Sequence, residues 1–356
     1  MPARDLDVDD LRSRLTANVD RRWPGASVVA VDALVGGASS LTYSVGVVVP
    51  GGPHRQIIVK VAPPGMAPTG NRDVLRQAKL LRAIAAVAGL NVPRVLFTDV
   101  GDPPGVPPLF ATNFVEGEPV EPLVDEVEGP LPVARWAARA RTAAEMLARL
   151  HAVDPSVVGL DEAVVSLGSE VERWVKLFET VEDALRPRAI ECGERLLDRV
   201  PVEESPSILH GDYRLGNMLC DRETIRAVID WEIWSLGDPR LDLAWFLANT
   251  CGGQPTAVRS VPGLPGPDEL ISRYERELGS EVHDLEWFDA LVRFKAGAAI
   301  ALIVKHNRNR SSPQPRLEAM ASYPAQFILQ ALAVLDRKAP PAWDPNRPRV
   351  PPRPSS

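Results

Sequence analysis

Hydrophobic positions near the start of the chain follow the spacing of a helix. Over residues 5–23 apolar residues recur every four positions and so share one helix face, at Leu11, Leu15, Val19 and Trp23. Short β-branched runs separated by glycine and proline fill residues 28–61, which is typical of a small antiparallel sheet with hairpin turns. A second helix is predicted over 73–87, and further strands are predicted at 94–97 and 109–115.

Beyond residue 118 the hydrophobic pattern is mainly helical. A long helix is predicted over 132–151, and a loop-rich island at 208–242 interrupts the helical spacing. We therefore predict an α+β fold with a small sheet-rich lobe, a connector, a larger helical lobe and a Pro/Arg-rich tail, divided at 1–112, 113–117, 118–338 and 339–356. A cleft between two such lobes is a common place for a ligand.

Composition and charge exclude several classes of function. The chain has 356 residues and a formal net charge of −7, which argues against broad electrostatic binding to nucleic acid or to anionic membranes. Cys192, Cys220 and Cys251 lie far apart without metal-ligand spacing, as is typical of free thiols in a reducing cytosol. No leader pattern opens the chain and no apolar run is long enough to span a bilayer, so we expect a cytoplasmic protein.

The island at 208–242 holds the residue types that phosphoryl transfer requires. Asp212 and Asn217 lie five residues apart in a predicted loop, and Asp230 follows a short apolar run that predicts a strand end. Phosphoryl transfer needs a carboxylate to accept the hydroxyl proton, oxygen ligands for Mg²⁺ and positive charge near the phosphates. Asp or Asn beside glycine is also a common turn pair, so each motif alone would predict only a turn. The three residues in this order favour the catalytic interpretation.

Three segments of the chain resemble the aminoglycoside phosphotransferase-like enzymes, small-molecule kinases related to protein kinases: HGDYRLGNML, VIDWE and GDPRLDLAWF. The resemblance extends over about residues 28–335. It implies a protein-kinase-like bilobal fold and the use of ATP and Mg²⁺ to phosphorylate a hydroxyl of a small molecule. It also implies Asp212 as the catalytic base, with Asn217 and Asp230 as the Mg²⁺ ligands.

Further residues of the same island are expected to support these three. The resemblance implies that His210 braces the catalytic loop and does not itself react. For Asp242 we favour a structural role at a helix start, where a carboxylate satisfies backbone amides of the loop. Asp238 is a second supporting candidate, and the sequence does not decide its role.

Two upstream segments are expected to hold the nucleotide phosphates. A loop of small residues joins two predicted strands, and the resemblance makes it the nucleotide-covering loop, with Gly37, Ser39 and Ser40 as contacts. On its own such a loop predicts only a hairpin. Lys60 lies in a β-branched run, and the resemblance favours an inward orientation toward the α- and β-phosphates over a solvated one.

The connector resembles the segment whose backbone binds adenine in the same family. This resemblance implies that Asn113, Phe114 and Val115 lie against the base. A plain edge strand that enters a turn at Gly117 would use the same residues, so both interpretations stay open.

One position departs from the family pattern. Gln77 stands where the corresponding helix commonly carries a glutamate that pairs with the strand lysine, and glutamine brings no charge, although Asp73 lies one turn earlier. This departure supports an alternative hypothesis, a non-catalytic nucleotide-sensing module. A protein kinase is disfavoured, because the segment 230–238 is too short to dock a peptide.

The class of acceptor stays open. Acidic residues gather after the connector, at Glu116, Glu118, Glu121, Asp125, Glu126 and Glu128. They would suit a cationic, aminoglycoside-like acceptor, but a solvated surface is the favoured interpretation. A basic run at 305–310 could instead line a pocket for an anionic acceptor. Trp231, Trp234 and Trp245 are expected mainly to pack, with part of the site aromatic.

Overall fold

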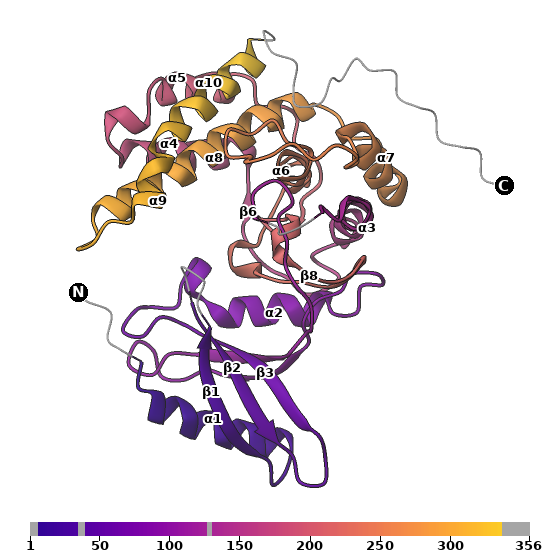
Figure 1. Cartoon of the computed structure of the whole chain (residues 1–356), viewed down its shortest axis with the longest axis vertical. Coiled ribbons are helices and arrows are strands. Elements are labelled where there is room, and N and C mark those ends of the chain that lie inside the picture. The colour runs from indigo at the N-terminus through magenta and orange to yellow at the C-terminus, as the bar shows by residue number, and fades with distance from the viewer. Residues whose placement is uncertain (1–5, 35–39, 127–129, 337–356) are drawn as a thin grey trace, which may run out of the picture.

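The computed structural model describes residues 6–34, 40–126 and 130–336, which form two lobes (Figure 1). The smaller lobe is built on a five-stranded antiparallel sheet in the order β1-β2-β3-β5-β4. Its strands are β1 (Ser27–Leu34), β2 (Leu41–Val48), β3 (His54–Val61), β4 (Val95–Asp99) and β5 (Leu109–Asn113).

Two helices cover opposite faces of this sheet, α1 (Val8–Arg22) and α2 (Val74–Ile84). Leu11, Leu15 and Val19 of the predicted apolar stripe are fully buried against the sheet, and Trp23, just after α1, is partly buried against the same cluster. Strand residues alternate between the two faces, so Val59 packs toward α1 while the adjacent Lys60 faces the other lobe. The Asp73 side chain accepts hydrogen bonds from the amides of Leu75 and Arg76, which explains why α2 begins at Val74.

The larger lobe is helical and contains most of the buried apolar residues. The 24-residue helix α8 runs through this core and packs along α10. The helices of this lobe are α3 (Val133–His151), α4 (Leu167–Glu179), α5 (Ala189–Leu197), α6 (Arg240–Cys251), α7 (Pro267–Leu278), α8 (Leu285–Arg308), α9 (Pro315–Glu318) and α10 (Tyr323–Leu335).

The predicted loop-rich island contains short strands between its loops. Its apolar runs are buried and form β7 (Ser207–Leu209), which pairs with β10 (Ser235–Gly237), and the hairpin of β8 (Met218–Asp221) and β9 (Thr224–Val228). β10 also pairs with β6 (Val164–Val165). Two 3₁₀ turns, η3 (Leu215–Asn217) and η4 (Trp231–Ile233), follow the loops that carry Asp212 and Asp230. The strands therefore hold both loops at the edge of the large lobe.

These elements confirm the predicted α+β fold with an antiparallel sheet in one lobe and helices in the other. The domain boundaries stay a prediction, and the predicted tail at 339–356 lies outside the described residues. No helix among residues 6–34, 40–126 and 130–336 has the length and apolar character needed to cross a bilayer.

Candidate active site

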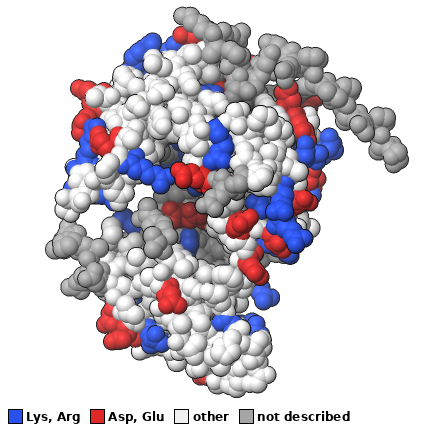
Figure 2. All heavy atoms as spheres, in the orientation of Figure 1, with Lys and Arg blue, Asp and Glu red and all other residues white. Residues whose placement is uncertain are grey.

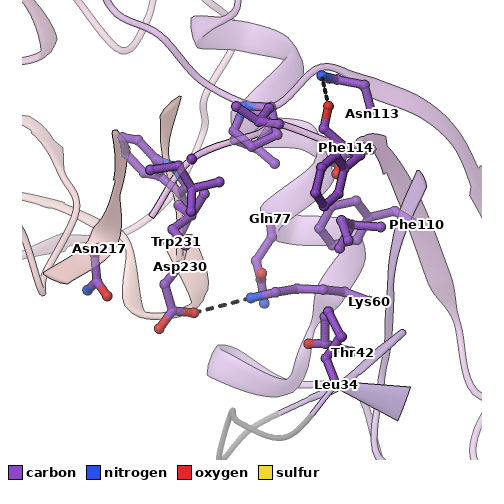
Figure 3. Close-up of a pocket in the computed structure, with 18 residues that line it drawn as sticks. Leu34, Thr42, Lys60, Gln77, Phe110, Asn113, Phe114, Asn217, Asp230 and Trp231 are labelled. Atoms are coloured by element: carbon purple, nitrogen blue, oxygen red, sulfur yellow. Dashed lines mark hydrogen bonds and ion pairs between the residues drawn. The ribbon is translucent and has the colours of Figure 1, made fainter. Parts of the chain in front are cut away.

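A cavity of about 380 Å³ lies between the sheet and the island of the helical lobe. Figure 2 shows the hollow between the lobes, with acidic and basic side chains on its walls. The sheet contributes Thr42, Lys60 and Phe110, which are neighbours in the strand register, and the island contributes Asn217, Asp230 and Trp231 (Figure 3). The cavity thus brings together residues that lie up to about half the chain apart.

An ion pair spans this cavity. Lys60 Nζ lies 3.2 Å from Asp230 Oδ1, and the two side chains are 18% and 39% exposed, respectively (Figure 3). Asp230 follows the end of β9 and has a left-handed backbone with φ of 67°, which turns its carboxylate toward the sheet. The lysine therefore faces the cavity, and its described partner is Asp230.

Gln77 lies on α2 with its side chain directed toward the Lys60 ammonium (Figure 3). It is 2% exposed, and its Nε2 donates a long hydrogen bond of 3.5 Å to the carbonyl of Asn71. Asp73 does not replace the missing glutamate, since its carboxylate is used as the cap of α2. Lys60 is consequently held by Asp230 across the cavity and not by a charge on α2.

Asp212, the predicted catalytic base, is surrounded by hydrogen-bond donors. Asn217 Nδ2 donates to Asp212 Oδ2 at 2.8 Å, and Trp245 Nε1 donates to Oδ1 at 2.7 Å. Arg214 Nε lies 3.1 Å from Oδ2 and 3.2 Å from Oδ1. Charge-assisted hydrogen bonds of this kind fix the orientation of a carboxylate.

Hydrogen bonds with Asp242 and His210 hold the backbone of the loop that carries Asp212. The Asp242 carboxylate on α6 accepts from the amide of His210 at 2.5 Å and from the amide of Gly211 at 2.9 Å. His210 accepts from the Asp212 amide at Nδ1, which leaves Nε2 to donate to the carbonyl of Ile229 at 2.9 Å. This imidazole therefore ties the Asp212 loop to the loop that carries Asp230.

Gly211 is required where the loop passes η4. Its φ is 85°, and a Cβ there would lie 2.7 Å from the carbonyl oxygen of Ile233, so a larger residue would displace the loop. Asp238 lies deeper and forms a buried ion pair with Arg240 at 2.6 Å, while its Oδ2 also accepts from the amide of Glu204. These contacts give Asp238 a place in the packing of the helical lobe.

Two of the three connector residues predicted to contact adenine already use their backbone amides within the protein. The amide of Asn113 donates to the carbonyl of Arg94, and the amide of Phe114 donates to the carbonyl of Gln56. Among the described residues, Val115 is the predicted adenine contact whose amide has no internal partner, although all three residues line the cavity. Ser40 is 5% exposed and its hydroxyl lacks a described partner, whereas Gly37 and Ser39 lie outside the described residues.

The oxygen atoms at the cavity suit a hard cation such as Mg²⁺ that takes most of its ligands from water and from substrate phosphates. The described residues contain no cluster of three or more His, Cys, Asp or Glu able to enclose a metal ion. They do contain the Asp230 carboxylate and the Asn217 amide, whose Nδ2 is committed to Asp212 and whose oxygen is left to accept. Mg²⁺ is commonly bound by one or two such oxygens together with water and substrate phosphates.

Comparison with known proteins decides the family. A model of the phosphotransferase enzyme family matches residues 31–291. The chain belongs to this family. The chain is 26% identical over 329 residues to acyl-CoA dehydrogenase family member 11 from Rattus norvegicus, a match that covers 86% of this chain and 41% of that relative. The chain spans less than half the length of the curated relatives that it matches.

Solved structures share the fold of the chain. A Ralstonia eutropha protein assigned as an aminoglycoside phosphotransferase superposes with a TM-score of 0.75 at 19% identity, and the match covers 94% of this chain and 99% of that chain. A ternary complex of an aminoglycoside phosphotransferase with AMP-PNP and hygromycin B gives a TM-score of 0.56 at 16% identity, with 92% and 99% covered. The predicted resemblance and the protein-kinase-like bilobal fold are confirmed.

Two charged groups beside the Asp212 loop are not apparent from the sequence. Glu121 is 5% exposed and its Oε2 accepts from the Gly216 amide at 3.0 Å and from Arg214 at 3.2 Å, so the favoured interpretation of a solvated surface is wrong at this position. Burial raises the pKa of Glu121 to about 7 despite the nearby Arg214 guanidinium. Arg214 thereby bridges Glu121 and Asp212.

The second group that the sequence does not indicate is a lysine ammonium next to the loop that carries Asp212. Lys295 on α8 donates from Nζ to the carbonyl of Gly211 at 2.8 Å, and its ammonium lies 4.4 Å from the ring centroid of Trp245. The sequence pattern around Lys295 is that of a buried apolar helix, which gives no signal for a site. Of the basic run at 305–310, Arg308 pairs with Glu182 and Glu318.

Proposed function

We propose that the protein transfers the γ-phosphoryl group of ATP, in the presence of Mg²⁺, to a hydroxyl group of a small molecule. The observation that carries this proposal is the convergence of Lys60, Asn217 and Asp230 on one interlobe cavity, with Asp212 bonded directly to Asn217. Phosphoryl transfer is catalysed mainly by positioning and by electrostatic stabilisation, and these four side chains supply both.

On the nucleotide side, Lys60 binds the α- and β-phosphates and exchanges its contact with Asp230 for them. Asp230 and Asn217 would hold Mg²⁺, which when bound neutralises charge on the phosphates. The Val115 amide is available for the adenine edge, and a contact of Ser40 with the phosphates stays a prediction. The contributions of Gly37 and Ser39 stay a prediction.

On the catalytic side, Asp212 accepts the proton of the acceptor hydroxyl. Trp245 and Asn217 hold the carboxylate in place, while Asp242 and His210 hold the backbone beneath it. Because these contacts lie within the large lobe, Asp212 keeps its orientation whether or not a nucleotide is bound.

The names of similar proteins suggest two acceptor classes to test. One structural neighbour was crystallised with hygromycin B, which makes aminoglycosides one class. The matched segments of the sequence relatives lie within proteins named acyl-CoA dehydrogenases, which makes hydroxylated acyl-CoA thioesters a second class.

The test is acceptor-dependent release of ADP or GDP from ATP or GTP, with Mg²⁺ and a panel of both classes and of simple hydroxylated metabolites. We expect turnover with at least one acceptor, and a loss of about 10³-fold in Asp212→Asn. Asp221→Asn, which removes an exposed carboxylate of the same island, serves as the matched control and should retain activity. Nucleotide binding without turnover on the whole panel would instead assign a nucleotide-sensing role.

A further inference from the structure

The surroundings of Lys295 carry an inference about the acceptor. Lys295 projects from α8 between two tryptophans, with its ammonium 4.4 Å from the ring centroid of Trp245 on α6 and 5.9 Å from that of Trp174 on α4. The same Trp245 donates to Asp212, and Lys295 itself donates to the carbonyl of Gly211, the residue before Asp212. Lys295 is therefore adjacent to Asp212, the carboxylate proposed to accept the proton of the acceptor hydroxyl.

The carboxylates whose charges act on Lys295 are already engaged by other partners. They are those of Glu170, Asp242 and Asp212. Glu170 accepts from Trp174 Nε1 at 2.7 Å and pairs with Arg173 at 2.9 Å. Asp242 accepts from two backbone amides, and Asp212 accepts from three side chains.

Lys295, in contrast, forms no ion pair within 4.0 Å among the described residues, and the Gly211 carbonyl is its one described hydrogen-bond acceptor. An ammonium has three N–H donors, so two remain for other groups. Burial lowers the pKa of Lys295, because removal from water disfavours the charged ammonium. An anion placed beside the ammonium would favour its charged form.

We propose that Lys295, flanked by Trp174 and Trp245, binds an anionic group of the acceptor, a carboxylate or a phosphate, while the acceptor hydroxyl lies against Asp212. This inference rests on the proposed function and narrows its substrate class. The two indole rings provide an apolar wall for the carbon skeleton between the hydroxyl and the anion. A polycationic aminoglycoside would bring further positive charge to Lys295 and is therefore disfavoured.

The experiment compares anionic acceptors with neutral partners and with a polycation. Acceptor-dependent ADP release is measured with 4-hydroxybutyrate and its neutral amide, with glycerol 3-phosphate and glycerol, and with kanamycin as a polycation. The first pair tests a carboxylate and the second a phosphate. We expect kcat/KM for the better anion to exceed that of its neutral partner by at least about tenfold, a typical difference for one charge-assisted contact.

Variants of Lys295 assign that preference to its charge. Lys295→Met keeps most of the side-chain volume and should abolish the preference for the anion, while Lys295→Arg keeps the charge and should retain part of it. The KM for ATP should stay unchanged in both. Lys305→Met removes a lysine from the last turn of the same helix and is the matched control for the preference.

Several results would overturn the inference. Equal kcat/KM within each pair, turnover of kanamycin alone, or an unchanged preference in Lys295→Met each contradicts it while leaving the proposed function intact. If no probe is turned over, quenching of tryptophan fluorescence replaces turnover as the readout, and anions that quench no better than their neutral partners contradict the inference. If Lys295→Met does not fold, Lys295→Arg and the comparison of anionic with neutral acceptors in the wild type still decide.

The proposed function itself fails on a separate result, the absence of Mg²⁺-dependent binding of AMP-PNP.

Discussion

On the nucleotide side of the site, the contact of Lys60 with Asp230 joins side chains from different lobes, whereas on the catalytic side Asp212 is bonded entirely within the large lobe. The first contact is partly exposed and is an ion pair that phosphates can exchange. The second set includes a buried amide, that of Asn217, which is 5% exposed. If the proposed roles hold, the catalytic half is already built in the nucleotide-free protein, while the nucleotide half is completed by its ligand.

The largest expected effect comes from the catalytic half. Asp212→Asn keeps the size of the side chain but removes the proton acceptor, so kcat should fall about 10³-fold. The affinity for AMP-PNP should change little, because Asp212 lies outside the set that lines the nucleotide cavity. Steady-state kinetics and calorimetry measure the two quantities separately, and a parallel loss of nucleotide affinity would mean that the two halves are not independent.

Removal of the interlobe lysine should have the next largest effect. Lys60→Met eliminates the positive charge directed at the phosphates, and we expect kcat/KM for ATP to fall about 10²-fold. The melting temperature should change little, since the ion pair is partly exposed and contributes little to stability. A loss of several degrees in melting temperature without a kinetic effect would make Lys60 a structural residue.

The next prediction concerns how the free energy of unfolding depends on pH through the buried Glu121. The folded protein keeps the Glu121 proton up to about pH 7, whereas the unfolded chain releases it near the ordinary value of 4.5. Folding therefore binds a proton in this window, and the wild type should lose stability relative to Glu121→Gln as pH rises from 5 to 8. The expected change in the difference is about 2–3 kcal/mol, measured by urea unfolding at both pH values. A constant difference would mean that Glu121 is ionised throughout.

The smallest expected effect concerns the donor to Asp212 from α6. Trp245→Phe removes the indole N–H but keeps an aromatic ring, and a hydrogen bond to a carboxylate contributes about 1.5 kcal/mol, or roughly tenfold in kcat. Steady-state kinetics with a turned-over acceptor measure this change. An unchanged kcat would show that Trp245 acts only by packing.

Local patterns predict much of this molecule. Alternation along the strand of Lys60 places the lysine on the sheet face opposite to that of the buried Val59. The spacing of Asp212 and Asn217 brings both residues to one loop. The unpredicted contacts join distant segments. Arg214 and Glu121 lie 93 residues apart, and Lys295 and Gly211 lie 84 apart. Glu121 is part of an acidic run that by composition alone looks solvated, so its burial depends on how the segment after the connector packs on the catalytic loop.

The central claim is that Asp230 and Asn217 act together with Lys60 on one Mg²⁺-bound triphosphate. Calorimetric titration of AMP-PNP with and without Mg²⁺ tests it in the wild type, Asp230→Asn and Asp212→Asn. We predict that Mg²⁺ strengthens binding at least about tenfold in the wild type and in Asp212→Asn, and that Asp230→Asn loses this gain. Full retention of the Mg²⁺ gain in Asp230→Asn would contradict the account.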